Sequence, residues 1–135
     1  MNEQARAILD ENVLGVLATV NEDGSPWATP LHFVADEKAL YWFSSDDRIH
    51  SANSMRDGRA SVVLFSPDTS QGLSAVYVRG VVGKVDMSDR ERVLELFRQR
   101  LGSVPPPFAT WGAYSLPLGV LDEQKSTGNC WYFYS

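Results

Sequence analysis

The chain has 135 residues and a mass of 15.0 kDa, which is the size of one domain and too small for two well-packed ones. Hydrophobic residues make up 44% and charged residues 21%, a balance that excludes intrinsic disorder. With 17 acidic and 12 basic residues the formal charge is −5, so the overall field repels a nucleic-acid backbone and we expect no nucleic-acid partner.

The number of cysteines and the first residues of the chain indicate which cellular compartment to expect. The single cysteine, Cys130, cannot form an internal disulfide and lies in no cluster that would complete a zinc site. The first residues carry no cationic segment that leads into an apolar one. We therefore expect one domain over residues 1–135 that is cytoplasmic and has no membrane partner.

The chain opens with a helix and a strand. Good helix formers with apolar residues at helical spacing predict a helix over residues 2–12. The β-branched and aliphatic run that follows predicts a strand over residues 13–20. Asp23 and Gly24 then suit a hairpin turn.

Two further strands complete a three-stranded meander, at residues 27–34 and 39–44. Pro26 and Pro30 cannot donate a hydrogen bond to a ladder. The second strand is therefore predicted at a sheet edge, or with a bulge that leaves backbone groups free for a ligand.

A short helix over residues 48–56 interrupts the strands. The polar residues 45–47 offer N-cap side chains before it. Ile49, Ala52 and Met55 recur at helical spacing and predict its apolar face.

The next elements are strands at residues 59–65 and 73–86, the second of which contains Gly80 and Gly83, where it could bend around a barrel corner. Five strands with one helical insert indicate a closed or partly closed barrel.

The last third begins with a helix over residues 88–101, for which Ser-x-x-Glu at its start predicts a capping box. The prolines at 105–107 predict an extended linker. Two last strands are expected at residues 114–121 and 130–134. The fold class is therefore mainly β, with antiparallel strands and two or three short helices.

The sequence lacks the common catalytic motifs for dinucleotide binding, phosphate loops, hydrolase elbows and zinc proteases. His32 and His50 are the two histidines, and neither stands beside a recognisable nucleophile or metal-ligand set. We therefore expect no metal site and no protein-only catalyst.

The segment Ser44 to Arg59 concentrates positive charge in an acidic chain, partly at a helix start where backbone amides also favour anions. It can form a phosphate clamp, or a solvated helix whose charges are neutralised by neighbouring aspartates. Its groups that can carry positive charge are Arg48, His50, Arg56 and Arg59.

The order of several short motifs carries a family resemblance. The turn Asn-Glu-Asp-Gly-Ser-Pro leads into Trp-Ala-Thr-Pro-Leu, followed by Leu-Tyr-Trp-Phe-Ser, a basic helix with His50-x-x-Asn53, and Arg-Ala-Ser-Val-Val-Leu. Over residues 5–86 this order resembles the pyridoxamine 5′-phosphate oxidase-like family of FMN-binding split β-barrels.

The resemblance implies a homodimer with FMN at its interface, acting on a small-molecule substrate. By position, the second strand would face the flavin ring through the backbone of Ala28, Thr29, Pro30 and Leu31. Phe43, Ser44 and Ser45 would lead into the phosphate site, with Arg48, His50 and Asn53 completing it.

One position departs from the family pattern. Many members resemble Ser-Arg-Lys at this helix start, whereas this chain has Asp47-Arg48-Ile49-His50. If His50 binds phosphate as a cation, affinity should fall as the pH rises past its pKa.

The leading interpretation is an FMN-dependent oxidoreductase, since the flavin would do chemistry for which the chain shows no acid–base pair. True pyridoxamine phosphate oxidase activity is not expected, because no Arg or Lys follows Lys125 to hold a substrate phosphate. The alternatives are a non-enzymatic flavin-binding stress or sensor protein, a relative that uses F420 or haem with His32 or His50 as haem ligand, and a dimeric barrel without cofactor.

Several other residues have two interpretations. Trp27, Tyr41 and Trp42 are expected in the core or a dimer interface, with flavin stacking as the second interpretation. Arg79 could reach a phosphate or carboxylate, or form an inter-subunit ion pair. The aromatic run 131–134 fits a last strand that packs at the interface.

Overall fold

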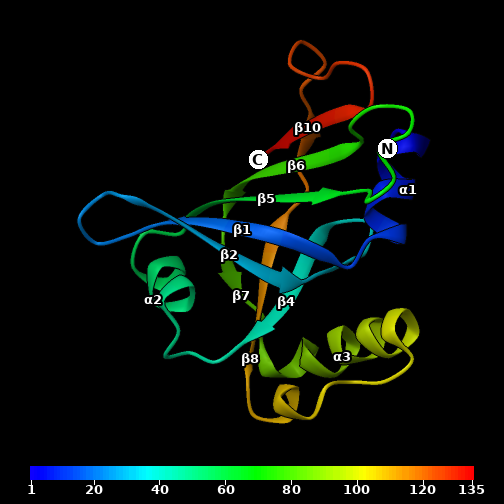
Figure 1. Cartoon of the computed structure of the whole chain (residues 1–135). Coiled ribbons are helices and arrows are strands. Elements are labelled where there is room, and N and C mark those ends of the chain that lie inside the picture. The colour runs from blue at the N-terminus through cyan, green and yellow to red at the C-terminus, as the bar shows by residue number, and fades with distance from the viewer.

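The computed structural model describes residues 1–135 and contains two β-sheets with three α-helices around them (Figure 1). One sheet has six strands in the order β2-β1-β5-β6-β10-β9, and the other has four in the order β3-β4-β8-β7. The strands of the first are β2 (Pro26–His32), β1 (Leu14–Val20), β5 (Arg59–Phe65), β6 (Ala75–Val81), β10 (Cys130–Tyr134) and β9 (Val120–Leu121). Those of the second are β3 (Val34–Ala35), β4 (Ala39–Ser44), β8 (Gly112–Pro117) and β7 (Gly83–Lys84).

The mainly β prediction is confirmed. Of the two predicted alternatives, a closed and a partly closed barrel, the closed one is wrong, because the strands form two separate sheets. The antiparallel prediction is wrong for β10, which runs parallel to β6. The parallel pairing arises because the chain leaves the first sheet after β6, passes through the second sheet, and returns to the far edge.

Three predicted strands each divide between the two sheets. The run 27–34 becomes β2 and β3, the run 73–86 becomes β6 and β7, and the run 114–121 becomes β8 and β9. At the three corners Phe33, Val82 and Leu118 are buried in the core between the sheets. Each corner residue thus fixes the point where the strand turns from one sheet to the other.

Strand β4 is buried on both faces and divides the interior into two cores. Leu40 and Trp42 point into the core between the sheets, whereas Tyr41 and Phe43 point into a second core. That second core is covered by α3 (Met87–Leu101), which buries Val93, Leu94 and Phe97.

The predicted positions of the three α-helices are confirmed, although their first and last residues differ from the predicted ones. Helix α1 (Glu3–Glu11) is capped by the side chain of Asn2, and α2 (Ile49–Arg56) follows β4. The predicted capping box of α3 is wrong, because Ser88 already lies inside a helix whose N-cap is Asp86. No helix combines the length and apolar character needed to cross a membrane.

The predicted extended linker at residues 105–107 is also wrong. The chain forms a short 3-10 helix there, η1 (Pro106–Ala109). Proline suits the first turn of a helix because its fixed φ is close to the helical value. Burial of Phe108 in the second core favours this turn over an extended chain.

Candidate functional site

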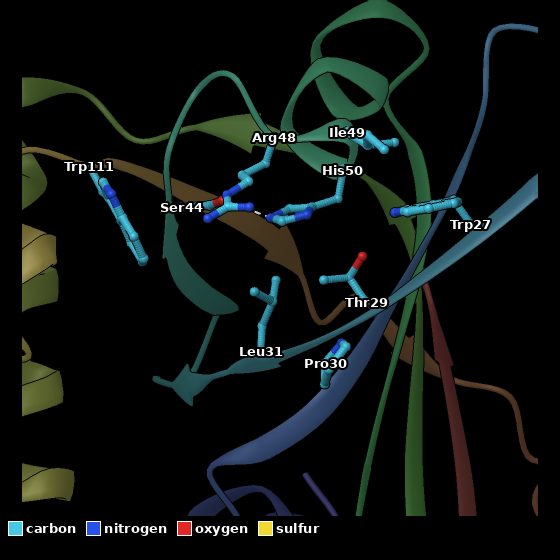
Figure 2. A pocket seen from close by; sticks show the side chains of 9 residues that line it. All are labelled: Trp27, Thr29, Pro30, Leu31, Ser44, Arg48, Ile49, His50 and Trp111. Carbon is cyan, nitrogen blue, oxygen red and sulfur yellow. Dashed lines mark hydrogen bonds between the residues drawn. The ribbon is translucent and has the colours of Figure 1, made fainter.

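A cavity of about 350 Å³ lies where β2, the end of β4 and the start of α2 meet (Figure 2). Arg48, His50 and Ser44 lie on one side of it, and Thr29, Pro30 and Leu31 lie on the other. The residues that line it are Trp27, Thr29, Pro30, Leu31, Ser44, Arg48, Ile49, His50 and Trp111.

Strand β2 forms one wall of the cavity from the edge of its sheet, as its prolines predict. Its pairing with β1 is regular from His32 to Pro26, so no bulge is present. Because β2 pairs with β1 alone in this sheet, its other side is free to face a ligand. Thr29 and Leu31 are half-buried on the cavity wall.

Helix α2 turns its polar side, not its apolar side, towards the protein. His50, Ser51, Asn53 and Ser54 are buried, whereas Ile49, predicted on the buried face, is 49% exposed. The predicted apolar face is therefore wrong. The buried polar side chains have hydrogen-bond partners, which removes most of the cost of burying them.

Asn53 shows how this polar face is anchored. Its Nδ2 donates to Thr19 Oγ1 at 3.0 Å and to Asn21 Oδ1 at 2.9 Å, which ties α2 to β1 and to the turn after it. Asn53 thus positions the helix and does not line the cavity.

His50 is the buried titratable group of the site, with 6% of its surface exposed. Its Nε2 lies 2.7 Å from Ser44 Oγ, and Ser51 Oγ lies 3.1 Å from the same oxygen (Figure 2 shows the first contact). Burial, followed by the positive charge of Arg48, lowers the pKa of His50 below its ordinary value. The lowered pKa favours the neutral imidazole.

Arg48 is the exposed cation at the mouth of the cavity and takes part in no ion pair. It occupies the N-cap position of α2, and no side chain caps this helix. The predicted capping by residues 45–47 is therefore wrong. The first-turn N–H groups of a helix have no acceptor within the helix, so this end of α2 can receive an anion together with Arg48.

Asp46, in the loop before α2, has two side-chain partners. Tyr114 donates its hydroxyl to Asp46 Oδ1 at 2.5 Å, and Lys84 Nζ lies 3.0 Å from both carboxylate oxygens. Burial, together with the nearby carboxylate, raises the pKa of Tyr114 to about 12. Gly112 is required here, because a Cβ atom would lie 2.7 Å from Asp46 Oδ1. These contacts fix the loop that leads to Arg48.

Six of the ten predicted site residues line the cavity, and they are Thr29, Pro30, Leu31, Ser44, Arg48 and His50. Ala28 of β2 does not line the cavity, and Ser45 lines a neighbouring hollow with Arg48. Phe43 points into the second core, where its ring lies 4.8 Å from that of Phe108.

Three lining residues were not predicted as site residues. Trp27, expected first in a core or dimer interface, is 39% exposed and lies at one end of the cavity. Its place in the lining could have been predicted, because it alternates along the strand with Thr29 and Leu31 and so shares their face. The place of Ile49 in the lining could have been predicted, because it is next to Arg48 in the sequence. Trp111 arrives from the loop before β8, and no local pattern in the sequence indicates this.

The fold and site define a mainly β protein with a cavity at a sheet edge that is lined by Arg48, His50 and residues of β2. A family model described as pyridoxamine 5′-phosphate oxidase matches residues 1–112. The chain belongs to the pyridoxamine 5′-phosphate oxidase family. No curated protein sequence matches it significantly.

Solved structures with the same fold have low sequence identity to this chain. A conserved hypothetical protein from Mycobacterium tuberculosis is 22% identical, with a TM-score of 0.72, and the match covers 86% of this chain and 79% of that one. The haem storage protein HutZ from Vibrio cholerae is 16% identical, with a TM-score of 0.71 and coverage of 83% and 85%. An F420 reductase is 23% identical, with a TM-score of 0.69 and coverage of 87% and 95%.

Some proteins with this fold are much longer than this chain, which matches only about half of their length. The chain covers 51% of a protein from Agrobacterium tumefaciens and 49% of a haem-binding protein from Mycobacterium smegmatis. Sequence identities this low show a common fold and no more. The names of these proteins refer to different cofactors.

The lowered pKa of His50 predicts how stability depends on pH. The unfolded chain takes up a proton near the ordinary pKa of about 6.5, whereas the folded protein resists protonation until a lower pH. The free energy of unfolding should therefore fall as the pH drops from 7 to 5. Urea unfolding at several pH values measures this, and His50→Gln should flatten the dependence.

His32→Gln is the matched control, because His32 is exposed on β2 and outside the cavity. This variant should keep the pH dependence of the parent. Equal flattening by both substitutions would contradict the assignment to His50.

Proposed function

We propose that the chain binds FMN noncovalently in this cavity and acts as an oxidoreductase on a small molecule. The observation that carries the proposal is one cavity with Arg48 and the uncapped start of α2 on one side and a largely apolar wall from β2 on the other. Family membership supports it.

The charged side of the cavity suits the phosphate of FMN. Arg48 has no competing carboxylate, and the helix start adds N–H donors. His50 lies beside Arg48 and can become a second cation if a bound phosphate offsets the burial that favours its neutral form.

The opposite wall suits a planar ring. Pro30 and Leu31 offer apolar surface, and Trp27 and Trp111 stand at the two ends of the cavity (Figure 2). Backbone groups on the free side of β2 can hydrogen-bond to ring heteroatoms, and Pro30 has no N–H that would be left unpaired there.

The division of labour follows from these residues. Bound flavin would supply the electron-transfer chemistry. Arg48 and the start of α2 would hold the phosphate, β2 would orient the ring, and Trp27 with Trp111 would exclude water from the ends. His50, with its hydroxyl neighbours Ser44 and Ser51, can exchange a proton inside the cavity.

A haem ligand is a second candidate, favoured by one observation. His50 is the buried imidazole of the cavity, and its lowered pKa favours the neutral form, which is the form that binds iron. A Soret band on adding haemin, lost in His50→Gln and kept in His32→Gln, would support this candidate over FMN. F420 needs the same kind of phosphate and ring contacts as FMN. A binding experiment in which F420 and FMN compete for the protein therefore shows which of the two it prefers.

FMN binding should depend on Arg48 more than on other surface cations. Because a charged hydrogen bond contributes about 1.5–3 kcal/mol, Arg48→Ala should weaken FMN binding roughly 10- to 100-fold. Quenching of flavin fluorescence measures the affinity. Arg59→Ala removes one positive charge that is paired with Asp57 outside the cavity, and it should leave the affinity nearly unchanged.

An affinity for FMN that Arg48→Ala leaves unchanged would contradict this placement of the phosphate. Absence of any spectral or thermal response of the parent protein to FMN would refute FMN binding itself.

The pH dependence of binding tests the role of His50. The free imidazole has a lowered pKa, and a bound phosphate raises it, so binding takes up a proton. Affinity for FMN should therefore increase as the pH falls from 8 to 6 and decrease as it rises. His50→Gln should remove this slope, and a slope that persists in the variant would exclude His50 as the proton acceptor.

Redox turnover separates an enzyme from a flavin carrier. NADH or NADPH added anaerobically to the FMN-loaded protein should bleach the flavin absorbance, and a small-molecule acceptor should restore it. Bleaching much faster than that of free FMN would support the oxidoreductase. If every donor and acceptor fails on a protein that binds FMN, the stress or sensor alternative is favoured.

A further inference from the structure

A second hollow adjoins the cavity at its charged side. Its volume is about 420 Å³, and it is lined by Ser45 and Asp47 from the loop before α2 together with Arg48 and Trp111. Arg48 and Trp111 also line the cavity, so the two spaces meet at these residues. A ligand that is held at Arg48 and continues past it would therefore enter this hollow.

The chemistry of the hollow disfavours a second phosphate. Asp47 brings a carboxylate into it, and Ser45 donates to Asp47 Oδ1 at 2.5 Å. Arg48 is the one cation that lines the hollow. A phosphate bound at Arg48 already uses this charge, so a further anionic group would meet a carboxylate and no cation of its own. Figure 2 shows Trp111 at the end of the cavity away from Trp27, with Arg48 between them.

Trp111 needs contacts outside the sheet to keep one position. It lies in the bend between η1 and β8, and the pairing of β8 with β4 begins only at Gly112. Its ring is packed against that of Phe108, with the ring centroids 5.8 Å apart. Phe108 lies in the second core, so the position of Trp111 depends on that core.

Arg90 on α3 supplies the polar contacts of this bend. Its Nη2 donates to the carbonyl oxygen of Trp111 at 2.8 Å and also to that of Phe108. Its guanidinium lies over the ring of Phe43, 5.2 Å from the centroid. Arg90 takes part in no ion pair, so its donors are free for the two carbonyl groups. Arg90 thus joins β4, η1 and the bend that carries Trp111.

We propose that Arg90 is a positioning residue that fixes Trp111 as the end wall of the cavity, and that this wall selects ligands that end at the phosphate. FMN ends there, whereas FAD carries a second phosphate and an adenosine group at the same point. Trp111 blocks that extension, and Asp47 repels its charge. The selection rests on the proposed function, but the role of Arg90 does not depend on a ligand.

Fluorine NMR of the ligand-free chain tests the role of Arg90. Labelling with 5-fluorotryptophan gives one signal for each of the four tryptophans, and Trp111→Phe identifies that of Trp111. Arg90→Met removes every N–H donor of the side chain, so the Trp111 signal should shift and broaden, and its D₂O isotope shift should increase. Arg98→Met is the matched control, because Arg98 lies on the same helix and pairs with Glu91 and Glu95. It should leave the Trp111 signal unchanged.

The signal of Trp42 in the same spectrum shows whether the core is intact, because Trp42 is buried between the sheets. Arg90→Lys is a milder variant, since it keeps the charge and N–H donors but lacks the planar group that lies over Phe43. It should move the Trp111 signal less than Arg90→Met and leave that of Trp42 in place. A Trp111 signal at the parent position in both variants would overturn the role of Arg90.

Equilibrium dialysis against FMN and FAD tests the selection. The parent should bind FMN more tightly than FAD, and Trp111→Ala should reduce this preference about 10-fold by opening the cavity to the hollow. Trp27→Ala is the matched control, since Trp27 stands at the other end of the cavity and should weaken the binding of both flavins alike.

Two results would overturn the selection: a preference that Trp111→Ala leaves unchanged, and a parent that binds FAD as tightly as FMN. If neither flavin binds, the proposed function fails, and with it the selection that rests on it. The fluorine signals of the ligand-free chain decide the role of Arg90 in either case.

Discussion

The site depends on one constraint, the position of β2 at the edge of its sheet. Pro26 and Pro30 cannot donate to a second neighbouring strand, so the ladder stops at β2. A strand with one neighbour leaves backbone on its free side, and the helix after β4 packs close to that side. Burial of Phe33 at the corner then carries the chain from β2 into the second sheet, which brings the end of β4 to the same place.

The second requirement is a helix that buries polar groups. Hydrophobic periodicity would place Ile49, Ala52 and Met55 inside, yet Asn53 and its serine neighbours are buried instead. Their hydrogen bonds to β1 and to the loop after β4 are directional, so they fix the helix in one orientation. Apolar packing alone would hold the helix with less angular precision. The same polar interior keeps His50 close to a hydroxyl, and burial there favours its neutral form.

Much of the fold could be predicted from local pattern, because strands and helices follow from spacing and turn residues. The prediction that the long strands are continuous was wrong. Nothing in the alternation of residues 73–86 shows that Val82 is a corner, since a buried corner residue and a buried strand residue have the same chemistry. The parallel pairing of β10 could not be predicted either, because it depends on where a long excursion of the chain returns.

The site was predictable where it is continuous in sequence. The basic helix start and the proline-rich strand indicate Arg48, His50 and residues 29–31. Phe43 and Asn53 do not line the cavity, because position in a family motif does not say which way a side chain points. Phe43 follows the alternation of β4 into the core, and Asn53 stands on the anchored side of α2. Trp111 lies far along the chain and reaches the cavity through tertiary structure alone.

Strand β2 shapes the cavity because it lies at the free edge of its sheet. Thr29 and Leu31 are half-buried on the cavity wall, and Pro30, although exposed, lines the same cavity. Successive side chains of a strand point to opposite faces of the sheet, so Pro30 can line the cavity together with its two neighbours only where the cavity reaches around the strand's unpaired side. The edge position of β2 thus sets both the lining of the cavity and the side on which it opens.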